Sequence, residues 1–158
     1  MNKPKLIYGV SEISLMLYEI QINSKQGLIS KIINENTDDW IYLVNEKIIN
    51  SLLERIQEKS IVEFDEYLKI YTIFNELVPQ IYGEGNTKDK AINQMVLEAK
   101  SFAKDYAENV ELFSNILDGT QQFFVSILLL NIEDDCKIRE ILKVYWGSVK
   151  SSVFRHSS

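Results

Sequence analysis

The sequence predicts an α+β protein in which a small antiparallel β-sheet, made of a hairpin and short strands, packs against several amphipathic helices. Three observations support this prediction. Residues 61–74 form two extended runs around an acidic turn, as in a β-hairpin. The glycine-punctuated run from Ile81 to Ile92 leads directly into an amphipathic helical pattern. Beyond residue 118 the apolar residues have helical spacing, which predicts a helical C-terminal region.

Length and composition are those of an ordinary globular chain. Of its 158 residues, 46% are hydrophobic and 25% are charged, and a chain of this size buries roughly 70% of its unfolded surface without a metal or disulfide. Its 17 basic and 23 acidic residues leave a net charge of −6. This charge argues against a protein that coats nucleic acid through its overall field, but it leaves room for a local DNA-binding patch. It suits a basic protein partner, and it equally fits ordinary solubility charge.

The sequence also bears on location. The apolar runs are too short to span a membrane, and the residues after Met1 lack the apolar region of a signal peptide. The single cysteine, Cys136, excludes an internal disulfide and suggests a reducing compartment. We therefore expect a cytoplasmic protein that does not bind membranes.

The N-terminal part, residues 1–60, predicts a small α/β module. Its expected elements are a short strand over 5–10, a helix over 13–22, a helix over 28–33, a strand over 40–44 and a helix capped by Asn45. The pattern over 13–22 also fits a strand, because Ile13, Leu15 and Leu17 alternate. The strand over 40–44 is rich in aromatic and β-branched residues, and Asn45 is a favourable N-cap.

The central part predicts a hairpin, a return and a helix. The hairpin arms, 61–64 and 68–74, surround Asp65-Glu66-Tyr67. In the second arm the more polar face is expected to carry Lys69, Tyr71, Ile73 and Asn75, and the less polar face Leu68, Ile70, Thr72 and Phe74. Pro79 cannot donate to a central ladder, so residues 77–82 are expected to form an edge strand or an extended return. We expect Gly83 and Gly85 to make the turn that follows.

Three helices are expected in the rest of the chain. Thr87 is a good N-cap for the first. Its apolar stripe is Ile92, Met95, Val96, Ala99, Phe102, Ala103, Tyr106 and Val110. A buried helix is expected over 123–130, and Asp134 begins another that carries Ile138, Ile141, Leu142, Tyr145 and Trp146. The tail 148–158 is expected to fray. Residues 61–158 would form a second region, which either stands apart from the first or packs with it as one domain.

The reactive side chains predict no enzyme, no cofactor and no metal site. His156 and Cys136, one of each type, cannot build a zinc site or a nucleophilic triad. The run Gly83-Glu84-Gly85 lacks the third glycine of a dinucleotide-binding fingerprint and the ending of a P-loop, and Glu84 would repel phosphate. We therefore expect a protein that acts by binding.

The candidate partner-binding residues lie around the hairpin. They are Glu63, Asp65, Glu66, Tyr67 and Tyr71. Carboxylates on a solvated turn lack the apolar cleft that acid–base catalysis needs, whereas tyrosine is enriched in interface hot spots. An acidic, partner-facing patch is thus the functional alternative to ordinary solvated side chains.

One stretch resembles the strand-to-helix junction of HicB-like antitoxin domains: Gly83-Glu84-Gly85-Asn86-Thr87-Lys88-Asp89-Lys90-Ala91-Ile92. In that family a Gly-x-Thr-x-x-x-Ala element follows a β-hairpin and opens a helix. The similarity covers residues 62–113 and includes Tyr106-Ala107-Glu108-Asn109 and Glu111-Leu112-Phe113. Residues 40–46 are similar to the strand and helix start that close a Phd/YefM-like module. The hairpin lacks the Gly-Tyr and Phe-Pro elements common in HicB domains.

This resemblance implies a bacterial, non-catalytic antitoxin that binds a cognate protein toxin, which we expect to be a small ribonuclease. It further implies contact with operator DNA through the N-terminal module, autoregulation of the operon, and a homodimer. The alternative is an immunity or adaptor protein that inhibits a secreted effector and has no DNA-binding role. An enzyme with a degenerate RNase-H-like fold is a third hypothesis, and it would need carboxylates that converge in a cleft.

Overall fold

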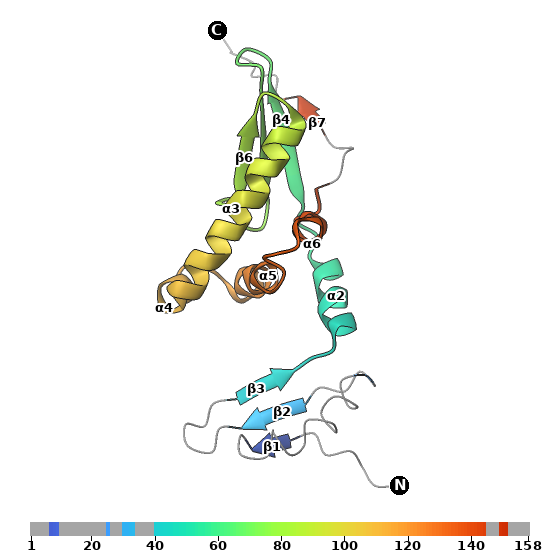
Figure 1. Cartoon of the computed structure of the whole chain (residues 1–158), viewed down its shortest axis with the longest axis vertical. Coiled ribbons are helices and arrows are strands. Elements are labelled where there is room, and N and C mark those ends of the chain that lie inside the picture. The colour runs from blue at the N-terminus through green and yellow to red at the C-terminus, as the bar shows by residue number, and fades with distance from the viewer. Residues whose placement is uncertain (1–6, 10–24, 26–29, 34–39, 145–148, 152–158) are drawn as a thin grey trace. The chain divides into compact units, whose positions relative to one another are not determined.

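The computed structural model describes residues 7–9, 25, 30–33, 40–144 and 149–151, and it divides the chain into two compact units, residues 1–56 and 57–158. Each unit contains a β-sheet, and both contain helix (Figure 1). The α+β class is therefore confirmed.

The first unit holds a three-stranded sheet with the order β1-β2-β3. Its elements are β1 (Ile7–Gly9), β2 (Ser30–Ile33), β3 (Trp40–Leu43) and helix α2 (Glu46–Arg55). Strand β2 runs parallel to β1 and antiparallel to β3. The Asn45 side-chain oxygen accepts a hydrogen bond from the backbone N–H of Lys47 at 2.7 Å, so the predicted cap of α2 is confirmed.

The helix predicted over 28–33 is wrong for Ser30–Ile33, which form β2. Ile32 pairs with Ile41, and Ile33 pairs with Trp40. So short an apolar run fits both the helical and the strand period of hydrophobic residues. Pairing with two neighbouring strands decides its conformation. The helix predicted over 13–22 lies outside the described residues, as do Tyr145 and Trp146.

The second unit holds a four-stranded sheet with the order β6-β5-β4-β7. Its strands are β4 (Ser60–Asp65), β5 (Ile70–Asn75), β6 (Tyr82–Gly85) and β7 (Val149–Ser151). Strands β4 and β5 are the predicted hairpin. The expectation that residues 148–158 fray is wrong for β7, which runs parallel to β4 with Val149 paired to Val62. The sheet is thus antiparallel except at this edge.

The two faces of β5 are not divided by polarity as expected. Ile73 and Asn75, placed on the more polar face, are 0% and 1% exposed, while Phe74 is half-buried. Asn75 is buried because it organises the following turn: its Oδ1 accepts hydrogen bonds from the N–H groups of Leu77 and Val78, both at 3.0 Å. Local capping therefore places a polar residue in the core.

Helix α3 (Lys88–Glu108) crosses one face of this sheet (Figure 1). Thr87 Oγ1 accepts from the N–H of Lys90 at 3.3 Å, so the predicted N-cap is confirmed. The buried residues of the helix are Ala91, Ile92, Met95, Val96, Ala99, Ala103 and Tyr106. Val110 does not extend this stripe: it begins the short helix α4 (Val110–Ser114) and is 48% exposed.

Gly83 and Gly85 lie within β6 and do not form a turn, which corrects the prediction. A Cβ atom on Gly83 would clash with the backbone of Ala91 and Met95, and one on Gly85 would lie 2.7 Å from the backbone nitrogen of Ala91. The glycines therefore let the α3 backbone approach the strand closely. The turn precedes them and is closed by the Ile81 N–H, which donates to the carbonyl of Val78 at 2.9 Å.

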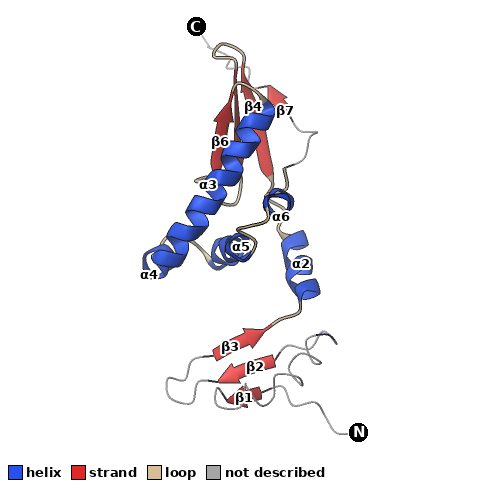
Figure 2. Cartoon of the chain, viewed as in Figure 1, coloured by secondary structure: helices blue, strands red, loops and turns tan. Residues whose placement is uncertain are grey.

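Helices α5 (Gly119–Leu130) and α6 (Asp135–Ile141) complete the second unit and confirm the predicted C-terminal helices (Figure 2). Gln121 Nε2 donates to the carbonyl of Leu77 at 2.8 Å, which ties α5 to the turn after β5. Ser60 Oγ donates to the carbonyl of Leu142 at 2.6 Å, which ties the end of α6 to β4. The core includes Phe124, Val125, Leu128, Ile138 and Leu142.

Candidate partner interface

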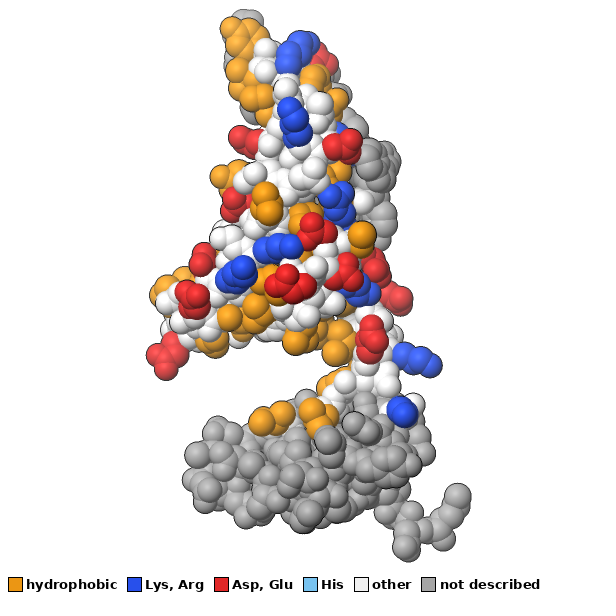
Figure 3. Space-filling view, viewed as in Figure 1, with side chains coloured by type: hydrophobic (Ala, Val, Ile, Leu, Met, Phe, Trp, Pro, Cys, Tyr) orange, Lys and Arg blue, Asp and Glu red, His pale blue; other side chains and the backbone are white. Residues whose placement is uncertain are grey.

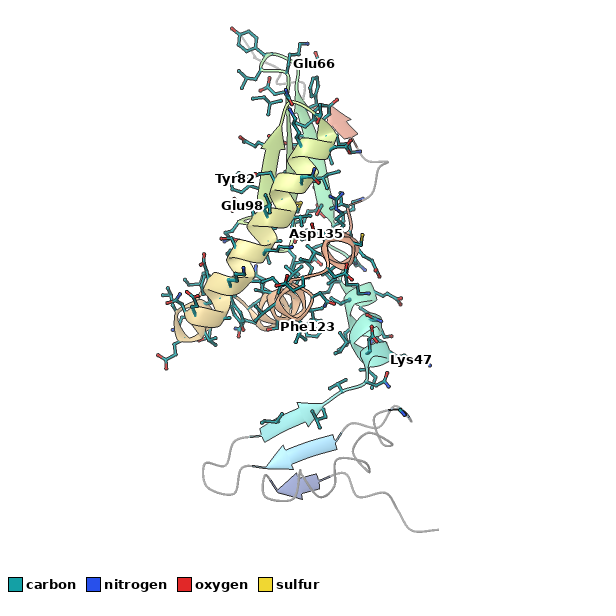
Figure 4. The ribbon with its side chains drawn as sticks, in the orientation of Figure 1. Lys47, Glu66, Tyr82, Glu98, Phe123 and Asp135 are labelled. Carbon is teal, nitrogen blue, oxygen red and sulfur yellow. The ribbon has the colours of Figure 1, made fainter. Side chains whose placement is uncertain are left out.

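The hairpin end is built around Asp65. Its Oδ1 accepts hydrogen bonds from the N–H groups of Tyr67 and Leu68, both at 2.8 Å. Lys69 completes the turn with a left-handed φ of 57°. The Asp65 carboxylate therefore shapes the turn that presents the residues after it, including Glu66, which projects at this end in Figure 4.

The tip of the hairpin exposes large side chains. Tyr67 is 94% exposed and Leu68 is 61% exposed, and Glu66 beside them is also exposed. Hydrophobic side chains gather at this end of the unit in the space-filling view (Figure 3). An exposed tyrosine and leucine next to a carboxylate are typical of a protein-binding surface. Leu68 is a candidate that the sequence prediction missed.

The structure brings Asp65, Glu66 and Tyr67 together at the tip and separates the other two candidates. The Tyr71 ring packs against Phe64, with 4.5 Å between ring centroids. Glu63 is one residue out of phase with Phe64, so it lies on the opposite face of the sheet, where it pairs with Thr72. Tyr71 therefore supports the hairpin, and Glu63 belongs to a different surface.

That surface is the sheet face turned away from α3, which we call the outer face. It carries two cross-strand rows, Ile61–Phe74–Tyr82 and Glu63–Thr72–Glu84. Tyr82 is 49% exposed, and Glu84 is also exposed. The sequence prediction missed both residues because it assigned their glycine neighbours to a turn. The available signal was period two: Tyr82 and Glu84 alternate with Gly83 and Gly85, as in a strand.

Exposed apolar residues also lie at the other end of α3. They are Val110 and Leu112 of α4 and Ile116 just after it. Hydrophobic side chains also gather over α4 and α5 in Figure 3. Leu130, expected within a buried helix, is 74% exposed because it lies at the last position of α5.

Reactive groups do not converge in the part of the chain that the structure describes. Within that part, no group of three or more histidine, cysteine, aspartate or glutamate residues could hold a metal ion. Cys136 is exposed on α6. No helix among these residues is both long and apolar enough to cross a membrane.

The comparisons with known proteins identify the class. The family model for PHD-like antitoxins of RelE/RelB toxin–antitoxin systems matches residues 12–144, and the chain belongs to this family. The prediction of an antitoxin is thereby confirmed, whereas its HicB-like and Phd/YefM-like details stay predictions.

One solved structure shares the fold. It is the crystal structure of an antitoxin part of a putative toxin/antitoxin system from Syntrophomonas wolfei subsp. wolfei, with a TM-score of 0.55 and 14% sequence identity. The match covers 92% of this chain and 96% of that chain. No curated protein sequence matches the chain.

Proposed function

We propose that this antitoxin binds and neutralises a cognate toxin, a small ribonuclease, by covering the basic surface with which the toxin holds RNA. The observation that carries this proposal is the family match over residues 12–144. The net charge of −6 supports it, because a ribonuclease needs a basic surface for its substrate and opposite charges steer association.

We place the first contact at the hairpin tip. Glu66 and Tyr67 supply an exposed carboxylate and an exposed aromatic ring on a turn shaped by Asp65. Tyr71 stiffens the hairpin from the helix-covered face through its contact with Phe64. Glu63 contributes from the outer face, where it faces the same partner along the sheet.

Co-expression with the product of the neighbouring gene tests this function. The two proteins are expected to co-purify, and the neighbour alone is expected to arrest growth and cleave RNA. The double substitution Glu66→Lys and Tyr67→Ala is expected to weaken binding at least about tenfold, because it reverses a charge and removes an aromatic anchor.

Glu133→Lys is the matched control. It makes the same charge reversal at an exposed position between α5 and α6, so it should leave affinity unchanged. The proposal fails if neither neighbouring gene product binds the chain. The hairpin contact fails if both variants bind like the original protein.

A second proposal concerns operator DNA. Lys47, Ser51 and Arg55 follow one another at four-residue spacing along α2, all are exposed, and with Ile48 and Leu52 they line a shallow hollow. Lysine, serine and arginine are the usual donors to DNA phosphates. We propose that the first unit contacts operator DNA in this way and that a homodimer autoregulates the operon.

Gel shift of the upstream operator tests the DNA proposal. We expect a shift that Lys47→Ala with Arg55→Ala weakens and Glu54→Ala does not. The alternative of an immunity or adaptor protein predicts no shift with either the original chain or the variants.

A further inference from the structure

Strand β6 is an edge strand, and half of its backbone polar groups face away from β5. The Asn75 N–H donates to the carbonyl of Ile81 at 3.1 Å, so these two residues occupy a hydrogen-bonded position of the antiparallel ladder, with the Ile81 N–H turned to Val78 instead. Such pairs alternate with non-hydrogen-bonded pairs. Ile73–Gly83 and Tyr71–Gly85 are therefore the next hydrogen-bonded pairs.

Tyr82 and Glu84 occupy the non-hydrogen-bonded positions, opposite Phe74 and Thr72. Their N–H and C=O groups consequently point to the open side of β6. Within the described part of the chain β6 has no other neighbouring strand, and no backbone hydrogen bond of the loops, turns and caps uses these groups. This edge is a template for one more strand.

The edge has only some of the features that usually prevent such pairing. Natural edge strands are protected by shortness, charged side chains, proline or a bulge, and β6 is short and carries Glu84 but has no lysine or proline. Its register with β5 is also continuous over all four residues, without a bulge. The strand is therefore regular along its length.

We propose that the open edge of β6 takes up an extended segment of the cognate toxin as an additional strand, with an apolar or aromatic residue beside Tyr82 and a lysine or arginine beside Glu84. This inference rests on the proposed toxin binding. An added strand extends the two rows of the outer face, so its residue next to Tyr82 continues the row from Ile61 and Phe74.

The charge of Glu84 determines which residue type the added strand should carry next to it. The row of Glu63 and Glu84 ends at the open edge, and a cation there would lie next to an exposed carboxylate. Lys90 lies over Gly85, at the far end of the strand. Lys90 thus lies on the helix-covered face, and the basic residue of the partner belongs beside Glu84 on the outer face.

A second copy of this chain fits the edge less well. Antiparallel pairing of two β6 strands about Gly83 would place Tyr82 of each copy opposite Glu84 of the other. Each carboxylate would then lack a cation from the added strand. A basic segment satisfies the same backbone groups and also neutralises Glu84.

Residue-resolved amide hydrogen exchange of the full chain, free and in complex with the toxin, tests the inference. In the free chain the amides of Tyr82 and Glu84 should exchange fast, and those of Gly83 and Gly85 slowly. In the complex both edge amides should slow at least about tenfold, as expected for a newly formed backbone hydrogen bond.

Two substitutions distinguish the contribution of the Glu84 backbone N–H to toxin binding from the contribution of its side-chain charge. Glu84→Pro removes one outward N–H and no bond to β5, so it should weaken toxin binding at least about tenfold. Glu84→Gln keeps the N–H and should cost only a few-fold. The thermal midpoints of both variants establish that each is folded, and the exchange measurement needs no variant at all.

The outcomes are distinct. A complex in which Tyr82 and Glu84 stay unprotected, or in which Glu84→Pro binds as well as Glu84→Gln, overturns the inference and leaves toxin binding intact. Protection that appears in the free chain and grows with its concentration overturns it in favour of self-pairing. If no complex forms, the proposed function fails and this inference fails with it.

Discussion

At the scale of single residues, several positions of the second unit serve the backbone rather than a partner. Asn75 is 1% exposed and polar because its Oδ1 caps the turn after β5. Asp65 makes the same pair of bonds at the hairpin tip. Gly83 has no side chain because the backbone of α3 occupies that space. For stability, residues with such roles tolerate little change, whereas substitution of the exposed Glu66 and Tyr67 should affect binding rather than folding.

Gly83→Ala should therefore destabilise the protein by about 1–3 kcal/mol, because the new methyl group must displace the backbone of α3. Urea unfolding measures the difference. Gly119→Ala is the matched control: a Cβ there meets nothing within 4 Å, so its effect should stay within about 0.5 kcal/mol. Equal stability of the two variants would show that α3 does not approach β6 so closely.

At the scale of elements, hydrogen bonds at the helix ends fix where several helices begin and end. Asp118 and Gln121 form a capping box at the start of α5. At the end of α6, the Lys143 N–H donates to the carbonyl of Glu140 and the Val144 N–H donates to that of Arg139. These two bonds are a Schellman motif, and Lys143 occupies its left-handed position with a φ of 50°.

Lys143→Gly should stabilise the protein by about 0.5–1 kcal/mol, because glycine adopts a positive φ without the steric cost that a side chain carries. Lys143→Ala removes the same side chain but keeps the Cβ, so it should bring no such gain. The comparison of the two variants by thermal unfolding isolates the backbone effect. A gain of equal size for alanine would assign the effect to loss of the lysine side chain instead.

At the scale of the whole molecule, the chain consists of two units that the family model spans together. The second unit contains its own sheet, and α3, α5 and α6 contribute to its core. In the first unit, α2 has no buried residue. A division of labour follows from our proposals, with DNA contact in the first unit and toxin contact in the second.

A fragment of residues 57–158 should accordingly fold alone. A core within the fragment predicts a single cooperative urea transition with a midpoint close to that of the corresponding transition in the full chain. Circular dichroism in the near ultraviolet should show fixed aromatic packing. A fragment without a cooperative transition would mean that residues 1–56 supply part of this core.

Prediction from the sequence succeeded where signals are local. Thr87 and Asp134 mark helix starts, and the turn residues around Asp65 mark the hairpin, because caps and turns act within a few residues. The residues at the tip of the candidate interface could be predicted from the same local turn signals. Glu84 and Tyr82 were not recognised, because their role depends on where β6 lies in the sheet.

The sequence by itself thus determined the α+β class, the capped helices, the hairpin and the antitoxin class of the protein. Only the tertiary structure decided that Ser30–Ile33 and Val149–Ser151 are strands, that Asn75 is buried, and that Gly83 lies under α3. The reason is physical. Strand pairing and close packing join residues that are distant along the chain, and their free energy overrides the weak local preference of short segments.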